Sequence, residues 1–303
     1  MSDTKKGISR RQFLTGAAMA AAVTALPLVA NVPTAAAASP IPTALNPASK
    51  PAWWGAGLPS KDLARQAYEI YKGVHAGQSA CCEATFWPII GYLAANGQPG
   101  FVDFPKSVFN FGGAGINAWR MQCGATNGGP AALKLAAGAV AGKIIDEYMR
   151  WYETALLPTA ALRADYDTGT WVPGGQATGW AAAGSTTLLP IPHASNPMNA
   201  GHSTLCHASL TAWRAAGGDW EFAHPGAQSD RCGKICYDAV FKQCELINAW
   251  MDAGVLPAGA VSGEVATCGE TGAAGCHGGS ATTKRTDGAT FAQAKAECSP
   301  CHE

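Results

Sequence analysis

The chain has 303 residues, with 21 basic and 21 acidic side chains. Residues 1–38 hold four of the basic and one of the acidic residues, so the remainder carries a net charge of about −3. A charge so close to zero argues against a nucleic-acid partner, whereas eleven cysteines are unusual for a chain of this size.

The N-terminus predicts an exported protein. The stretch Ser9–Leu14, SRRQFL, matches the twin-arginine signal. A weakly apolar run over 16–30 and small residues over 35–39 then suit a cleaved signal peptide, 1–38. A membrane anchor is the alternative, but the Ala-rich run falls short of the ~20 strongly apolar residues that span a bilayer. No later segment is apolar enough either, so we expect no stable membrane insertion.

Five segments carry apolar residues at helical spacing. They are 60–77, 79–97, 128–158, 203–218 and 229–254. Ser60 is a plausible N-cap, and Pro130 and Pro158 frame one long helix over 128–158. No segment alternates with a convincing period of two, so the fold class is mainly α, with a helical domain over 40–258.

Two further segments are poor in apolar bulk. Residues 159–200 are rich in Gly, Thr and Pro, and so long an irregular stretch usually serves a site or an interface. Gly, Ala and Thr also dominate a C-terminal tail, 259–303. This weakly structured tail cannot pack on its own strength, so a covalent cofactor would have to organise it.

The tail ends in a c-type haem attachment motif. Cys298, Cys301 and His302 form C-x-x-C-H, in which two thiols add to the haem vinyl groups and the histidine becomes the proximal iron ligand. A chance triplet or a disulfide is the alternative. Haem c is attached outside the bacterial cytoplasm, which agrees with the export signal and predicts a periplasmic protein.

A second, displaced haem motif lies upstream in the tail. Cys276 and His277 form its second half, but Cys268 lies eight residues before Cys276 rather than three. Three alternatives remain: a haem held through a long Gly-rich loop, a haem held by Cys276 alone, or a disulfide between the two cysteines without haem.

The twin-arginine route carries folded proteins, usually because a cofactor is inserted before export. Haem c is added after export, so the signal indicates a second cofactor.

Seven cysteines precede the tail, and four of them lie close to predicted helix starts, where the helix dipole favours the metal-binding thiolate. These four are Cys82, Cys123, Cys206 and Cys232. Four thiolates can hold an iron–sulfur cluster, although periplasmic disulfides explain the spacing equally well. Cys236 and Cys244 are expected in the core of the last helix.

The stretches CCEATF, MQCGATNGG, LCHASLTAW and RCGKICYDAV, in this order, resemble the C_GCAxxG_C_C family and, within it, the split-Soret cytochromes c. The resemblance spans about 62–303, with 159–200 as an unmatched insert. It implies a mostly helical homodimer with two haems per chain and a cluster on Cys82 (or its neighbour Cys81) and the other three cysteines. Gln122 and Gly124 depart from the pattern, which has Gly and Ala there.

Five histidines remain as candidates for the sixth haem ligands, and a second histidine on the iron suits electron transfer. They are His75, His193, His202, His207 and His224. We favour His202 and His207, because they flank Cys206 in a family motif; in the family the partner subunit also contributes to ligation.

The sequence therefore predicts a dihaem electron-transfer protein that serves an unknown redox partner. The alternatives are a haem enzyme that reduces a small molecule and a non-redox binding protein stapled by disulfides. No nucleotide-binding loop, Ser-His-Asp arrangement or H-E-x-x-H motif points to another chemistry.

Overall fold

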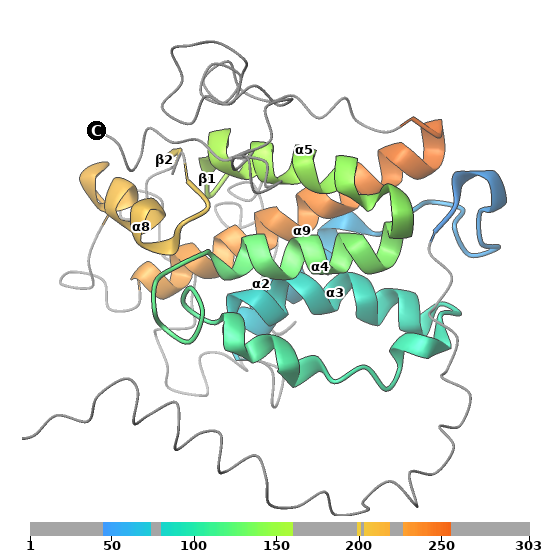
Figure 1. Ribbon diagram of the computed structural model, residues 1–303, viewed down its shortest axis with the longest axis horizontal. Helices are drawn as coiled ribbons and strands as arrows, with labels where there is room; N and C mark the ends of the chain where they lie inside the picture. Colours follow the sequence, from blue (N-terminus) through green and yellow to red (C-terminus); the bar gives the residue numbers. More distant parts are fainter. Residues whose placement is uncertain (1–44, 74–79, 160–198, 201–202, 219–226, 256–303) are drawn as a thin grey trace, which may run out of the picture. The chain divides into compact units, whose positions relative to one another are not determined.

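Helices dominate the computed structural model, which describes residues 45–73, 80–159, 199–200, 203–218 and 227–255 (Figure 1). These residues all belong to one unit of the chain, Pro42–Glu303, whereas the other unit, Met1–Ile41, lies outside the described residues. The α-helices are α2 (Ser60–Tyr71), α3 (Cys81–Ala95), α4 (Gly124–Ala137), α5 (Ala141–Thr154), α8 (Cys206–Ala215) and α9 (Ala227–Ala253). Short 3-10 helices are η1 (Pro47–Ser49), η2 (Pro99–Phe101), η3 (Lys106–Gly112) and η4 (Gly138–Val140).

The mainly α fold predicted from the sequence is confirmed. Within the described residues, β1 (Leu156–Leu157) and β2 (Asn199–Ala200) form one short antiparallel pair. Glycines with positive φ lie just beyond several helices. Gly254 follows α9 as expected, and Gly73 lies two residues after α2, which ends six residues short of the expected end.

The single long helix predicted over 128–158 is wrong. Gly138 has φ 58° and ψ −123°, a conformation open to glycine and strained for any other residue, so α4 ends there and the chain reverses. After η4, α5 runs back along α4 (Figure 1). Because the chain reverses, the C-terminal end of α5 lies near the N-terminal end of α4. This places Tyr152 near Cys123.

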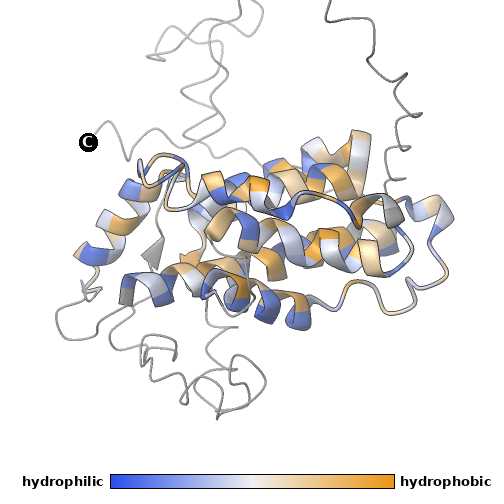
Figure 2. Ribbon diagram, turned by 90° about the horizontal axis from the view of Figure 1, so that it is seen from below, coloured by the Kyte–Doolittle hydropathy of each residue, from blue (hydrophilic) through white to orange (hydrophobic). Residues whose placement is uncertain are grey.

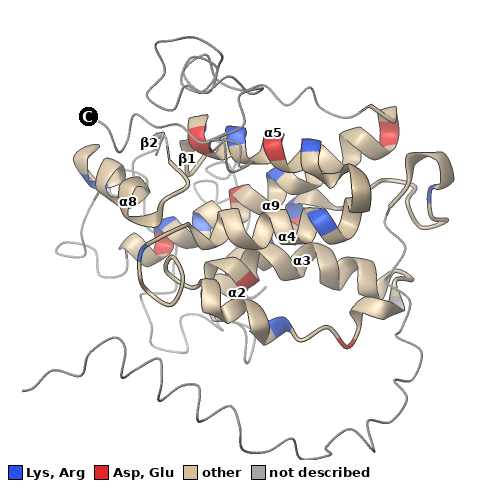
Figure 3. Cartoon of the chain, viewed as in Figure 1, with Lys and Arg blue, Asp and Glu red and all other residues tan. Residues whose placement is uncertain are grey.

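The core forms where α9 packs against α2, α3, α4 and α5. Buried side chains from α3 and α9 fill the centre, among them Phe86, Ile89, Ile90, Val240 and Ile247. Figure 2 shows apolar and polar residues on the same helices, as expected for helices that bury one face. Acidic and basic residues are dispersed over the described helices (Figure 3). Of the helices described, none has the length and apolar character needed to cross a membrane.

A buried hydrogen bond from Tyr68 of α2 to an ion pair within α9 joins these two helices. The Lys234 ammonium lies 2.7 Å from the Asp230 carboxylate, and the Tyr68 hydroxyl donates to the same carboxylate at 2.7 Å. All three residues are at most 1% exposed. Because a buried charge is costly without its partner, this contact fixes the α2–α9 packing beside Cys232.

Close contact between α3 and α4 depends on glycine. A side chain at Gly124 would collide with the Cys81 sulfur, and one at Gly128 would collide with the Cys82 carbonyl group. The lack of side chains at these two positions lets the first turn of α4 lie directly against the first turn of α3. The Gly124 departure from the family pattern therefore has a steric reason in this chain.

Candidate metal centre

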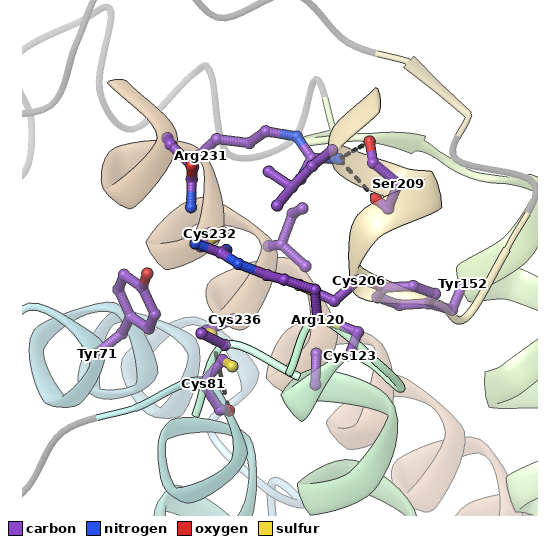
Figure 4. A pocket seen from close by; sticks show the side chains of 15 residues that line it. Tyr71, Cys81, Arg120, Cys123, Tyr152, Cys206, Ser209, Arg231, Cys232 and Cys236 are labelled. Carbon is purple, nitrogen blue, oxygen red and sulfur yellow. Dashed lines mark hydrogen bonds between the residues drawn. The ribbon is translucent and has the colours of Figure 1, made fainter. Parts of the chain in front are cut away.

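Five cysteines line one cavity at the end of the helical domain (Figure 4). Its volume is about 80 Å³, several times the ~10–15 Å³ that one water molecule needs. The five are Cys81, Cys123, Cys206, Cys232 and Cys236. They come from α3, the start of α4, the start of α8, and α9, so segments far apart in the sequence meet here.

Backbone hydrogen bonds place Cys123 beside Cys206. The Cys123 N–H donates to the Thr204 carbonyl at 2.7 Å, and the Cys206 N–H donates to the Met121 carbonyl at 2.6 Å. Gln122 and Leu205 pair as an antiparallel bridge between these two bonds. Cys123 is the N-cap of α4 and Cys206 is the first residue of α8, so two helix starts point at one cavity.

Cys232 and Cys236 lie one turn apart on α9 and share a face of that helix. Both line the cavity, and Cys236 is fully buried. The expectation that Cys236 is a core residue therefore describes its burial but misses its place at the site. Cys244, two turns further on, is buried in the core away from the cavity lining.

Only one cysteine of the doublet lines the cavity. Cys81 lies in the lining. The Cys82 side chain packs instead against Gly112, so closely that a side chain at position 112 would collide with it. Neighbouring residues on a helix point about 100° apart, so α3 can present only one of the two thiols. The structure thus brings together Cys123, Cys206 and Cys232 of the predicted set, with Cys81 rather than Cys82.

The cavity is positively charged. Arg120 and Arg231 line it, and its described lining contains no acidic side chain. Arg231 is 2% exposed, its Nη2 donates to the Ser209 carbonyl at 3.2 Å and to Ser209 Oγ at 2.8 Å, and its Nε has no partner. Two cations and several thiols suit an anionic occupant, such as a thiolate-ligated group.

Arg120 reaches the cavity from an unusual turn. Five non-glycine residues between η3 and α4 have positive φ: Ala114, Ile116, Asn117, Ala118 and Arg120. Such values are uncommon and cluster at functional sites, where surrounding contacts offset the strain. The Arg120 N–H donates to the Ala114 carbonyl at 3.1 Å, which holds this turn against the cysteines.

The Cys123 thiol is the most acidic of the described cysteines. A hydrogen bond from Cys81 lowers the pKa of Cys123 to about 6, helped by the Tyr152 hydroxyl, the Ala125 N–H and the Arg231 charge, and opposed by burial. Cys81 donates that bond, so its own pKa rises well above the usual value. Cys123 is thus the thiolate of the pair.

The expectation of lowered thiol pKa at the other helix starts is wrong. Burial raises the pKa of Cys82 to about 12 and of Cys206 to about 11, and burial also raises the pKa of Cys232. Cys232 lies in the second turn of α9, too far from its N-terminus for a strong dipole effect. At Cys206 and Cys232, desolvation of the thiolate outweighs both the helix dipole and the hydrogen bonds that Arg120 and Tyr71 make to the two sulfurs.

Five cysteines in one lining supply the four thiols that an iron–sulfur cluster requires. Among the described residues, no three His, Cys, Asp or Glu side chains converge closely enough to hold one metal ion. The cysteines instead surround a cavity, as the thiolates of an iron–sulfur cluster do. All seven described cysteines are free thiols, so the disulfides considered as an alternative are absent among them.

His207 lies in the first turn of α8 and is exposed. Its Nδ1 is 2.9 Å from the Arg120 carbonyl oxygen, which orients the ring and leaves Nε2 for another partner. The other predicted haem residues lie outside the described part of the chain, namely His202, Cys268, Cys276, His277, Cys298, Cys301 and His302. His75, His193 and His224 also lie outside it.

Sequence reasoning missed the polar residues of the site. Tyr152, Arg120 and Arg231 line the cavity, yet none carries a motif that marks it. Cys236 could have been found, because a cysteine four residues after Cys232 on a helix must share its face.

A model of the twin-arginine translocation pathway signal sequence matches residues 7–27, which confirms export by that route to the periplasm. Fold, signal and cavity together define an exported, mainly helical protein with a thiol-lined site. The chain is 30% identical over 258 residues to the split-Soret cytochrome c of Desulfovibrio desulfuricans, covering 82% of this chain and 77% of that protein. A solved structure described as a novel iron centre in the split-Soret cytochrome c of the same organism matches with a TM-score of 0.58 and 25% identity, over 86% of this chain and 89% of the other. The chain belongs to the split-Soret cytochrome c family.

Proposed function

We propose that the protein is a periplasmic electron-transfer protein that carries two c-type haems and one iron–sulfur cluster. The observation that carries this proposal is the terminal C-x-x-C-H motif in an exported member of a cytochrome c family. Bound haem would supply one-electron chemistry, and the chain would supply its ligands and its contact with a redox partner protein.

Each haem has a defined set of candidate residues in the tail. Cys298 and Cys301 would form the thioether bonds of one haem and His302 its proximal ligand. Cys276 and His277 would hold the second, with Cys268 as a candidate for further attachment through the Gly-rich loop. The candidate sixth ligands are His202 and His207; the fixed ring of His207, with Nδ1 held by a carbonyl, supports its assignment.

The cluster would lie in the cysteine-lined cavity on Cys81, Cys123, Cys206 and Cys232. The charge of the lining supports this assignment, because Arg120 and Arg231 would offset the negative charge of a thiolate-ligated cluster. Two unpartnered buried polar atoms in the lining, the Tyr152 hydroxyl oxygen and Arg231 Nε, also indicate a polar occupant. The related cytochrome from Desulfovibrio desulfuricans, whose solved structure resembles this fold, is described as having a novel iron centre.

We also propose that the protein forms a homodimer, as the family resemblance implies. Exposed apolar side chains support a partner surface: Trp119 is 76% exposed, and Phe111 and Met121 are about half exposed. Analytical ultracentrifugation of the haem-loaded protein should give twice the chain mass.

Intact-mass spectrometry of the protein purified from the periplasm tests the haem assignment. We expect the mass of the signal-cleaved chain plus two covalent haems, and one haem fewer in the Cys298→Ala/Cys301→Ala variant. An unchanged haem content in that variant contradicts the assignment. Low-temperature EPR separates electron transfer from catalysis, because low-spin, six-coordinate iron is closed to substrate whereas high-spin iron is open to it.

A further inference from the structure

Tyr152 places an unpartnered hydroxyl group at the cysteine-lined cavity. The residue lies in the last turn of α5, is 1% exposed, and lines the cavity with Cys123 (Figure 4). Its hydroxyl group makes no hydrogen bond to the described residues, although it lies close enough to the Cys123 sulfur to help lower the pKa of that thiol. A buried hydroxyl without a partner destabilises the fold, so a phenylalanine would serve packing better at this position.

A second buried tyrosine on the same helix has a hydroxyl group that makes a hydrogen bond. Tyr148 lies one turn earlier on α5, is also fully buried, and donates to the Ala125 carbonyl at 2.9 Å. Tyr148 lies outside the cavity lining. The helix thus buries two tyrosines, one bonded to backbone and one with its donor directed at the site.

The Cys123 sulfur is the acceptor that we infer for the Tyr152 hydroxyl group. Cys123 is the N-cap of α4, and its side chain lines the same cavity as Tyr152. Most of the lining is buried, including Cys81, Cys206 and Cys236, and a hydrogen bond to sulfur is electrostatically stronger where water is scarce.

We propose that the Tyr152 hydroxyl donates a hydrogen bond to the cluster-bound Cys123 sulfur and thereby raises the reduction potential of the cluster. The inference rests on the proposed cluster and adds a positioning residue that tunes it. A hydrogen bond to a ligand sulfur draws electron density from the iron and stabilises the reduced state, which carries more negative charge.

The test compares Tyr152→Phe with Tyr148→Phe in the full-length, haem-loaded protein. Both changes remove one buried hydroxyl from α5, but only the first removes the donor at the cavity. In an EPR-monitored redox titration, we expect a lower cluster potential in Tyr152→Phe, with iron and acid-labile sulfide contents equal to the wild type. Tyr148→Phe should keep the wild-type potential and lose thermal stability.

A stronger donor gives an independent readout. Site-specific 3-fluorotyrosine at position 152 keeps the shape of the side chain and donates more strongly, so the cluster potential should rise above the wild-type value. This variant decides the question even if Tyr152→Phe fails to retain its cluster. An unchanged potential in a cluster-loaded position-152 variant, or equal shifts in both phenylalanine variants, overturns the inference alone. A wild-type protein without acid-labile sulfide overturns the proposed cluster as well.

Discussion

Replacing Gly128 by alanine tests how the packing of α4 on α3 shapes the site. An added Cβ would lie 2.5 Å from Thr85 Oγ1 and 2.9 Å from the Cys82 carbonyl carbon, and it would collide with the Cys82 carbonyl oxygen. These are backbone atoms and a bonded hydroxyl of α3, so the clash is relieved only when the helices move apart, by on the order of 1 Å. Alanine gains up to ~1 kcal/mol of helix propensity, but overpacking of this kind costs ~1–3 kcal/mol or more.

We therefore expect Gly128→Ala to lose about 2 kcal/mol of stability, or roughly 4–8 °C in Tm for a domain of this size. Because α3 carries Cys81 and α4 begins at Cys123, their separation should also lower the iron content. Gly142→Ala is the matched control, since nothing lies within 4 Å of its added Cβ in α5, and it should be neutral or slightly stabilising. Thermal unfolding by far-UV circular dichroism measures both, and a Gly128→Ala protein as stable as Gly142→Ala would refute the packing argument.

Three further predictions follow from the same contacts. Cys81→Ser should lower iron and acid-labile sulfide while Cys82→Ser keeps both, because only Cys81 lines the cavity; the reverse pattern would exchange their roles. Lys234→Met removes one charge of the buried Lys234–Asp230 ion pair, so it should cost ~3–5 kcal/mol in chemical denaturation, and a loss under ~1 kcal/mol would show that the pair is dispensable. The Soret band should be split in the two-haem protein and single after replacement of both residues of Cys276–His277, since two haems on one short tail should stack; an additive wild-type spectrum would place them far apart.

The helices were predictable where a start or stop residue in the sequence coincides with a helix end in the structure. Gly254 follows α9 as predicted, and the apolar spacing in 229–254 identifies α9 to within two residues. The prediction of Ser60 as an N-cap is wrong, because Ser60 is the first residue of α2 and Pro59 is its N-cap. The sequence pattern around Gly138 predicts an uninterrupted helix, because a glycine in an Ala-rich helical segment is usually tolerated. Only its backbone conformation, set by α5 packing back on α4, shows that it reverses the chain.

Most cysteines of the candidate site were predictable from the sequence, whereas the polar residues around them were not. Cysteines at helix starts and their order in the chain placed Cys123, Cys206 and Cys232 in one set, and the cavity contains all three. Spacing could not choose between the two thiols of the doublet, since that depends on the rotation of α3 against Gly112. Arg231 and Tyr152 meet the cysteines only through tertiary packing, which leaves no local signal in the sequence.

The thiol chemistry shows why burial must be weighed against the helix dipole. The dipole argument predicts acidic thiols at several helix starts, yet among the described cysteines only Cys123, to which the Cys81 thiol donates, has a lowered pKa. Cys206 begins α8 and still has a raised pKa, because burial removes the water that would stabilise its thiolate. The iron ions of a bound cluster would stabilise these thiolates in addition to Arg120 and Arg231.

The central claim is that this cytochrome holds iron outside its haems, in the cysteine-lined cavity. The most direct measurement is the ratio of total iron to covalent haem, together with acid-labile sulfide, in protein exported with its own twin-arginine signal. The account predicts more iron than haem, with sulfide present, and loss of that excess alone in a Cys123→Ser variant. Iron equal to haem with no sulfide in the wild-type protein would contradict it.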